Sequence, residues 1–183
     1  MKTKYMTALF EVKELGSEGF IAGYASVFGE VDAQSDVVAK GAFTRSLSRY
    51  KQSKSNPAML WMHDTGEPIG VWTSVNEDAR GLRVEGKLAV KTQHGAEAYE
   101  LLKIGAVSGL SIGYSAIKSV KDSKTKIRTL TEVELYEISL VTFPANSLAR
   151  VHTVKEHTDN QLNHNEFQAI VMRLRNTANA LKN

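Results

Sequence analysis

Hydrophobic residues in the first 150 or so positions follow the short patterns that are typical of β-strands. Alternation with a period of two, and short apolar runs bounded by turn residues, both indicate strands. Gly16, Gly66, Pro68 and Gly81 stand in the gaps and mark turns. The pattern predicts strands at about 5–13, 19–28, 58–63, 69–76, 81–90, 107–118 and 127–142. About seven short strands indicate an antiparallel β-barrel that is closed or nearly closed.

Hydrophobic residues at helical spacing interrupt the strand pattern in two places. The segment AFTRSLSRYK places Phe43, Leu47 and Tyr50 on one face and predicts a helix. The segment TQHGAEAYELLKIG predicts a second helix, with Thr92 as its N-cap and Gly105 at its end. The expected fold is therefore β-rich α+β, a barrel with surrounding helices.

Glycine and proline divide the chain into two parts. All 13 glycines and all three prolines lie before residue 145, and 147–183 contains neither. We expect a β-barrel domain at 1–151, followed at 152–183 by a polar linker and a C-terminal amphipathic helix that begins near Asn163. The apolar stripe of that helix comprises Phe167, Ile170, Leu174, Ala178 and Leu181. Such a stripe needs a partner, which is either the barrel or another chain.

The composition excludes several classes of chemistry. The 183 residues correspond to about one domain with an appendage. The chain has no cysteine, which rules out disulfides, a thiolate nucleophile and cysteine-ligated zinc. No apolar run approaches the roughly 20 residues of a membrane span, and charges break up the first residues too often for a signal peptide. We therefore expect a soluble, cytoplasmic protein without a membrane partner.

Positive charge gathers in one place, between Lys118 and Arg128. The net charge of the chain is only +3, which is too small to indicate a nucleic-acid partner. A surface that follows a phosphate backbone usually interleaves aromatic residues with the basic ones, and this stretch has none. We interpret it as the solvated tip of a hairpin, with an oligonucleotide-binding barrel as a weaker alternative.

Two polar residues, Glu137 and His63, stand where the surrounding pattern is apolar. Glu137 shares one face of its predicted strand with Ser139 and Val141, and a buried carboxylate is costly unless it is hydrogen-bonded. His63 ends an apolar run just before a turn. A carboxylate that reaches solvent, a β-bulge that resets the register, or a structural histidine explains the pattern as well as a functional site does. The other histidines have no carboxylates at metal-binding spacing, so we expect no metal site.

Ser111 lies on a strip of small residues between Gly109 and Gly113. Glycine in a strand often marks a close backbone approach, which would leave room for an extended substrate, although a bend in the strand explains it too. A serine, a histidine and a carboxylate are the parts of a nucleophile, a base and an orienting group. The spacing of Ser111, His63 and Glu137 does not by itself show that they meet.

Four blocks of sequence occur in a distinctive order within residues 20–151. They are GYASVFGEVDAQSDVVAKGAFTRSL, then LWMHD followed by PIG, then SGLSIGY, then LYEISLVTFPAN. Together they resemble the prohead (head maturation) protease family of tailed bacteriophages, which is similar to the herpesvirus assemblin serine proteases and their β-barrel fold. The resemblance implies His63 as the base, Ser111 as the nucleophile and Glu137 as the third member, where the herpesvirus enzymes have a histidine.

The resemblance also implies where a substrate carbonyl would bind. The oxyanion-binding loop would contain Ala145 and Asn146, with a backbone N–H or the Asn146 amide as the donor, because developing negative charge needs such a donor. Gly109 and Gly113 are the further candidates for substrate contact. No cofactor is implied.

The function implied is that of a serine endopeptidase inside the phage procapsid, in the host cytoplasm. It would cleave the scaffold protein, or a scaffold-like region of the major capsid protein, and also itself during head maturation. Segment 152–183 would be a docking helix or a self-processed tail. The resemblance leaves open whether the chain forms a homo-oligomer. No specific nucleic acid is implied. The alternative is a noncatalytic assembly module that binds capsid subunits through the barrel and the C-terminal helix.

Overall fold

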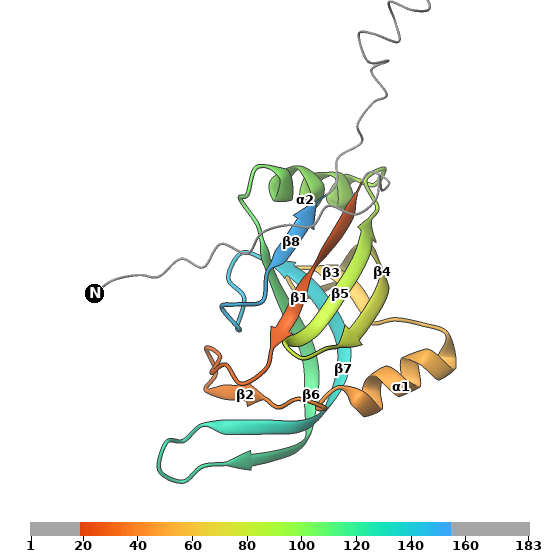
Figure 1. Cartoon of the computed structure of the whole chain (residues 1–183). Helices are drawn as coiled ribbons and strands as arrows, with labels where there is room; N and C mark the ends of the chain where they lie inside the picture. Colours follow the sequence, from red (N-terminus) through yellow and green to blue (C-terminus); the bar gives the residue numbers. More distant parts are fainter. Residues whose placement is uncertain (1–18, 155–183) are drawn as a thin grey trace, which may run out of the picture.

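The computed structural model describes residues 19–154, which form one β-rich unit with two helices (Figure 1). Its elements are β1 (Phe20–Val27), β2 (Asp36–Val38), α1 (Thr44–Ser53), β3 (Ala58–Trp61), β4 (Asp64–Glu77), β5 (Gly81–Leu88), α2 (Gln93–Lys103), β6 (Gly109–Lys121), β7 (Arg128–Val141) and β8 (Val151–Val154). The predicted strand at 5–13 and the predicted C-terminal helix lie outside the described residues. The first positions of the predicted linker, 152–154, belong to β8.

The strands form one mixed sheet that curls into a half-barrel, rather than the antiparallel barrel that the alternation predicted. Their order is β2-β7-β3-β4-β5-β1-β8, and β6 pairs with β7. β2 and β3 both run parallel to β7, so the expectation of a purely antiparallel sheet is wrong. A bridge between Gly109 and Arg150 links the start of β6 to the chain before β8. Alternation shows that a segment is a strand but not which strand it joins.

β7 is the strand around which the sheet is organised. β6 pairs with it from Arg128 to Val141. β2 and β3 pair with different parts of its other edge, β2 with Arg128–Leu130 and β3 with Glu137–Leu140. Helix α1 lies between these two strands in the chain and is the crossover that a parallel connection requires.

Most of the predicted elements are confirmed, and the two that were missed are short. Six predicted strands correspond to β1, β3, β4, β5, β6 and β7, whereas β2 and β8 have only three and four residues. The two helices predicted within the described residues are both present. Neither of them is long and apolar enough to cross a membrane. The Thr92 side chain accepts a hydrogen bond from the Gly95 N–H, as an N-cap does. Gly105, with a φ of +74°, follows the last turn of α2.

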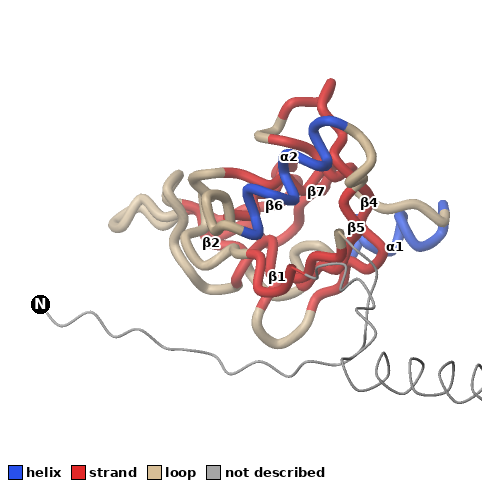
Figure 2. Tube along the Cα trace, turned by 90° about the horizontal axis from the view of Figure 1, so that it is seen from above, coloured by secondary structure: helices blue, strands red, loops and turns tan. Residues whose placement is uncertain are grey.

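The interior of the curled sheet is filled by large apolar side chains. α2 lies across one end of the sheet, as the view from above shows (Figure 2). The largest of the fully buried side chains are Phe43, Ile21, Met59, Ile69, Leu82, Leu88, Leu110, Leu130, Leu135, Ile138, Leu140 and Val84. They come from all the long strands, so the core ties the sheet together rather than stabilising one hairpin.

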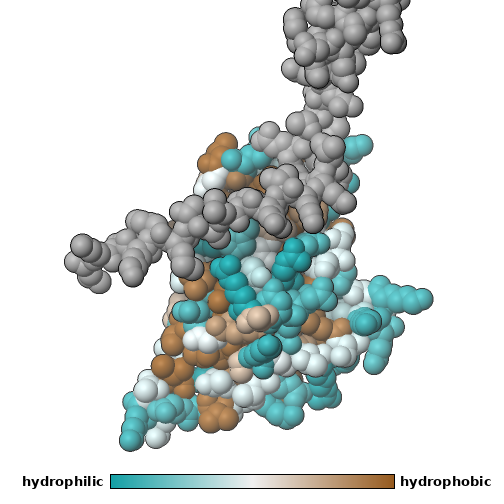
Figure 3. Space-filling view, viewed as in Figure 1, coloured by the Kyte–Doolittle hydropathy of each residue, from teal (hydrophilic) through white to brown (hydrophobic). Residues whose placement is uncertain are grey.

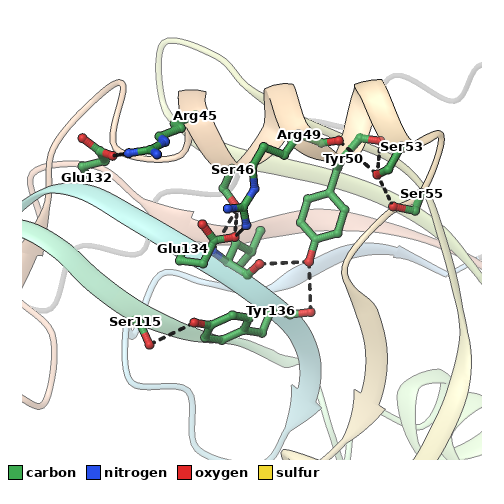
Figure 4. A network of polar contacts seen from close by, with 11 residues as sticks. Arg45, Ser46, Arg49, Tyr50, Ser53, Ser55, Ser115, Glu132, Glu134 and Tyr136 are labelled. Atoms are coloured by element: carbon green, nitrogen blue, oxygen red, sulfur yellow. Dashed lines mark hydrogen bonds and ion pairs between the residues drawn. The ribbon is translucent and has the colours of Figure 1, made fainter.

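Polar contacts hold α1 against β7 (Figure 4). Arg45 Nη1 forms an ion pair with Glu132 at 2.9 Å. The Tyr50 hydroxyl donates to the Leu135 carbonyl at 2.9 Å, and the Ser46 hydroxyl accepts from the Leu135 N–H at 3.0 Å. These bonds satisfy backbone groups of β7 along the stretch where neither β2 nor β3 covers its edge.

The basic stretch forms the tip of the β6–β7 hairpin, as predicted. Asp122 shapes the turn, since its carboxylate accepts from the N–H groups of Lys124 and Thr125, both at 2.8 Å. Lys118 pairs with a glutamate on the neighbouring strand, which reduces the local positive charge. Figure 3 shows the hydrophilic surface of this tip.

An ion pair between a buried aspartate and a partly exposed arginine fixes β2 to β7. Asp36 is 2% exposed and accepts from Arg128 Nε at 2.8 Å and from Arg128 Nη2. These hydrogen bonds from Arg128 lower the pKa of the Asp36 carboxyl. A lowered pKa means that Asp36 stabilises the fold above its unfolded-state pKa of about 3.9, and that this contribution is lost as the pH falls through the folded value.

We predict that Asp36→Asn lowers the free energy of unfolding at pH 7 by about 1–3 kcal/mol, because it removes the charge that Arg128 binds. Urea unfolding between pH 7 and pH 3 measures this. The difference between parent and variant should stay constant above pH 5 and shrink below about pH 4. Glu100→Gln on the exposed face of α2 is the control, with an expected change within about 0.5 kcal/mol. A difference that does not depend on pH would contradict the prediction.

Candidate active site

His63 and Ser111 border the same cavity, which has a volume of about 220 Å³. Its walls come from β1, β2, the loop between them, β6 and the loop that follows β7, where Ala145 and Asn146 line it. Four of the residues singled out from the sequence therefore meet at one hollow. Segments that are far apart in the chain contribute to it, because the sheet curls.

The register of β7 brings the candidate residues together. Ser139 of β7 lies opposite Ser111 of β6 on one side and opposite Leu60 of β3 on the other. Glu137, two positions earlier, lies opposite Gly113 of β6. The carboxylate, the serine and the end of β3 are thus placed side by side by strand pairing alone.

His63 lies in the two-residue turn between β3 and β4, at a sharp change of chain direction. Met62 and His63 both have left-handed backbone conformations, with φ values of 50° and 65°. Such values are uncommon for residues other than glycine and cluster at functional sites. The Met62 N–H donates to the Leu140 carbonyl at 3.0 Å, which keeps this turn against β7.

Glu137 is buried, and the atoms around it satisfy its charge. Oε1 lies 2.6 Å from His63 Nδ1, and Oε2 accepts from the Ser139 hydroxyl at 2.5 Å. The exposure of the residue is 9%. The pairing of β6 with β7 shifts its register next to Glu137, between Gly113 and Tyr114. The β-bulge that the sequence pattern offered as an alternative explanation for Glu137 is therefore present beside the contact with His63. Because an ionised carboxylate can only accept, Nδ1 of His63 carries the proton and Nε2 is left as the basic nitrogen.

Ser111 is 8% exposed and lines the cavity that His63 also lines. Among the described residues, no hydrogen bond joins its hydroxyl to His63. The structure thus brings His63 and Glu137 into direct contact and places Ser111 in the same cavity without a direct bond to the imidazole.

The candidate oxyanion residues lie at the cavity, and the side-chain amide of Asn146 is already engaged. Its Nδ2 donates to the Val27 carbonyl at 3.0 Å, and its Oδ1 accepts from the Leu148 N–H at 3.1 Å. The bond to Val27 ties the loop after β7 to β1, whereas the bond from Leu148 lies within the loop. Among the described residues, no hydrogen bond engages the backbone N–H groups of Ala145 and Asn146, and the Asn146 amide keeps one further hydrogen, so both kinds of donor considered from the sequence remain for a ligand.

Gly109 and Gly113 have a packing role that the sequence could not reveal. A Cβ at Gly113 would lie 2.2 Å from Oε1 of Glu137, and a Cβ at Gly109 would lie 2.5 Å from the Val141 carbonyl oxygen. Neither distance is sterically possible. Gly113 therefore provides the space in which the Glu137 carboxylate lies, whatever contact a substrate makes with these glycines.

Several further polar residues of the cavity were missed by sequence reasoning, and three of them, Asp36, Tyr114 and Arg128, form one hydrogen-bonded group. The Tyr114 hydroxyl donates to Asp36 Oδ2 at 3.0 Å, beside the pair between Asp36 and Arg128. Burial, reinforced by the Asp36 carboxylate, raises the pKa of Tyr114 to about 12. All three line the cavity that holds Ser111. Asp36 lies in a strand of three residues, which is too short for a pattern to single it out.

The other described histidines belong to different surroundings. His94 pairs with Glu67, and the His152 ring meets the Tyr24 ring edge-on with 5.9 Å between centroids. Burial lowers the pKa of His152. Within residues 19–154, no group of three histidine or acidic side chains is arranged to hold a metal ion.

Sequence comparison shows the family to which this chain belongs. The family model described as "Caudovirus prohead serine protease" matches residues 8–164, which include every residue of the cavity. The chain belongs to this family. The family resemblance inferred from the four sequence blocks is thereby confirmed.

Individual relatives agree with this membership. The prohead protease of Enterobacteria phage HK97 is 37% identical over 145 residues, which cover 76% of this chain and 62% of that protein. The capsid polyprotein of Pseudomonas phage PAJU2 is 33% identical over 162 residues, covering 85% of this chain and 23% of that protein. This family member thus spans less than two thirds of the length of each of these relatives.

The fold is also shared with a solved structure. The bacteriophage T4 capsid assembly protease, gp21, matches with a TM-score of 0.57 over 68% of this chain and 82% of that one. At 12% sequence identity, the match supports the fold alone.

We predict that Gly113→Ala displaces the Glu137 carboxylate, because the new methyl group would occupy its position. The contact between His63 and Glu137 should then be lost, and the free energy of unfolding should fall by about 1–3 kcal/mol. The low-field proton signal of the His63 Nδ1–H in ¹H NMR, together with urea unfolding, measures both effects.

Gly66→Ala is the matched control. Its Cβ would lie 3.2 Å from a side-chain oxygen of Asp64, at the exposed start of β4, where this neighbouring side chain can move. The low-field signal should survive this change. Its survival in Gly113→Ala as well would mean that Gly113 does not determine where Glu137 lies.

Proposed function

We propose that this chain is a serine endopeptidase in which Ser111 is the nucleophile, His63 the general base and acid, and Glu137 the orienting carboxylate. The observation that carries the proposal is the contact of 2.6 Å between His63 Nδ1 and Glu137 Oε1, at the cavity that Ser111 also lines. Membership of the prohead serine protease family supports the same assignment. The proposed activity of this chain is therefore the cleavage of proteins in the phage prohead.

The reaction uses the two imidazole nitrogens differently. Nε2 of His63 takes the proton from Ser111 Oγ as this oxygen attacks the carbonyl carbon of the scissile peptide bond. Glu137 keeps the proton on Nδ1 and stabilises the imidazolium that forms. His63 then gives its proton to the leaving amine, which leaves an acyl group on Ser111. A water molecule, deprotonated in turn by His63, attacks the carbonyl carbon of this ester. The bond from that carbon to Ser111 Oγ breaks, the acid product leaves, and His63 returns the proton to Oγ.

The hydrogen bond from Ser111 to His63 would form when the substrate binds. Catalytic hydrogen bonds are often long or incomplete without substrate and tighten in the complex. A rotation of the Ser111 side chain, or one bridging water, would connect the hydroxyl to Nε2 across the shared cavity. The absence of a direct bond among the described residues is thus compatible with the proposed role.

Backbone N–H groups of the loop that contains Ala145 and Asn146 are the proposed oxyanion donors. This loop lines the cavity and is fixed to β1 by the amide of Asn146. A fixed donor is effective because it needs no reorganisation as negative charge develops on the carbonyl oxygen. One such donor contributes roughly 3–4 kcal/mol to the transition state in comparable enzymes.

The proposed substrates are capsid or scaffold proteins of the same phage. One relative is a prohead protease, and a region similar to this chain is part of a capsid polyprotein in another. We propose that this protease acts inside the procapsid, in the host cytoplasm, on the major capsid protein or the scaffold protein, and on itself. Segment 152–183 would serve as a docking helix or be removed by self-cleavage.

We predict that Ser111→Ala abolishes the processing of the major capsid protein when the two proteins are expressed together. Glu137→Gln should lower the rate by about 10³–10⁴-fold, because the amide no longer selects the productive tautomer of His63. Mass spectrometry of the products measures cleavage, its position and self-processing together.

Ser115→Ala is the matched control, since Ser115 is an exposed serine on the same strand. It should process the capsid protein like the parent. Cleavage by folded Ser111→Ala would overturn the proposed nucleophile. If Ser111→Ala and His63→Ala both left head maturation unchanged, the noncatalytic assembly module would be the correct function.

A further inference from the structure

Ser139 is a fully buried serine that contacts two members of the proposed triad. Its exposure is 0%. Its hydroxyl donates to Glu137 Oε2 at 2.5 Å and accepts from the backbone N–H of His63 at 3.2 Å. One side chain therefore connects the carboxylate to the chain segment that carries the imidazole.

The two bonds of Ser139 are compatible because a hydroxyl has one proton to donate and two lone pairs to accept with. The proton is used on Glu137, and a lone pair receives the His63 N–H. Both oxygens of Glu137 are then engaged, one by Ser139 and one by His63. The terminal torsion of a glutamate is broad, so the carboxylate would rotate more freely if one of these bonds were lost.

The bond to the His63 backbone has a second effect. Two successive N–H groups of the left-handed turn point to β7: that of Met62 to the Leu140 carbonyl, and that of His63 to the Ser139 hydroxyl. The Ser139 hydroxyl thus stabilises an uncommon backbone conformation just where the imidazole leaves the chain. A change of about 1 Å in such a position can reduce catalysis about 100-fold.

We propose that Ser139 is a positioning residue of this site, whose hydroxyl sets the Glu137 carboxylate and the His63 backbone in the geometry that joins Nδ1 to Oε1. The inference rests on the proposed function for its catalytic consequence. Its geometric part does not depend on activity. Ser139 acts through Glu137 and His63, so it should affect turnover rather than substrate binding.

A second buried serine offers an internal comparison. Ser46 of α1 also accepts from a backbone N–H, in this case that of Leu135 on β7 at 3.0 Å, and donates to the carboxylate of Glu134 at 3.4 Å (Figure 4). Its exposure is 1%. Ser46 does not line the cavity of Ser111, so it shares the hydrogen-bonding pattern of Ser139 without the connection to the site.

The test compares Ser139→Ala, Ser139→Thr and Ser46→Ala in the full chain. A peptide that spans the cleavage site of the capsid protein provides kcat and KM. The low-field proton signal of the His63 Nδ1–H reports the contact with Glu137, and urea unfolding reports stability. The Ser139→Thr variant keeps the hydroxyl. If Ser139→Ala loses function and Ser139→Thr does not, the hydroxyl is the group that positions Glu137 and His63.

We expect Ser139→Ala to lower kcat by about 10–100-fold with KM changed less than about twofold, and to shift or abolish the low-field signal. Ser139→Thr should regain the signal and part of kcat. Ser46→Ala should lose comparable stability while keeping both kcat and the signal within error.

The outcomes separate this inference from the proposed function. An inactive parent, or an active Ser111→Ala, would overturn the proposed function, while the NMR signal would still test the role of Ser139. An active parent whose Ser139→Ala variant keeps kcat and the signal would overturn the positioning role. A loss of stability in Ser139→Ala equal to that in Ser46→Ala, with kcat and signal unchanged, would also overturn it.

Discussion

Burying the Glu137 carboxylate in a β-strand costs free energy unless hydrogen bonds satisfy both of its oxygens. Several features of the structure meet this requirement together. Gly113 leaves the space that the carboxylate occupies, Ser139 donates to one oxygen, and His63 contacts the other. The left-handed turn at the end of β3 brings the imidazole to that oxygen. The need to stabilise one buried charge thus accounts for a glycine, a serine and an uncommon backbone conformation at once.

β7 makes this arrangement possible because it uses both of its edges. One edge pairs with β6, which carries Ser111. The other edge pairs with β3, and His63 lies in the turn that follows β3. The same strand supplies Glu137 and Ser139 from its own length. A site built on paired strands is held more firmly than one built on loops, because the ladder of backbone hydrogen bonds fixes each Cα. The cavity is completed by the loop after β7, which Asn146 attaches to β1.

The sequence and the structure contribute differently to the candidate site. The out-of-phase positions of Glu137 and His63 and the small-residue strip around Ser111 were visible in the sequence. The resemblance to prohead proteases assigned roles to all three. The catalytic roles are proposals. The structure adds that His63 contacts Glu137 and that His63 and Ser111 line one cavity. Ser139 was recognised only as a neighbour on the same face, because a small buried serine resembles ordinary core packing. Asp36 gave no signal, since β2 is too short to show alternation.

Local chemistry determined which segments are strands and helices, because hydrophobic periodicity, N-caps and glycine stops act over a few residues. It predicted six of the described strands, both described helices and the hairpin tip between Lys118 and Arg128. It did not determine pairing, because a strand with an apolar face can join any matching edge, in either direction. The tertiary structure decided that β2 and β3 run parallel to β7 and that the sheet is mixed. The same non-local pairing decided that His63 meets Glu137, since residues far apart in sequence become neighbours only when the sheet curls.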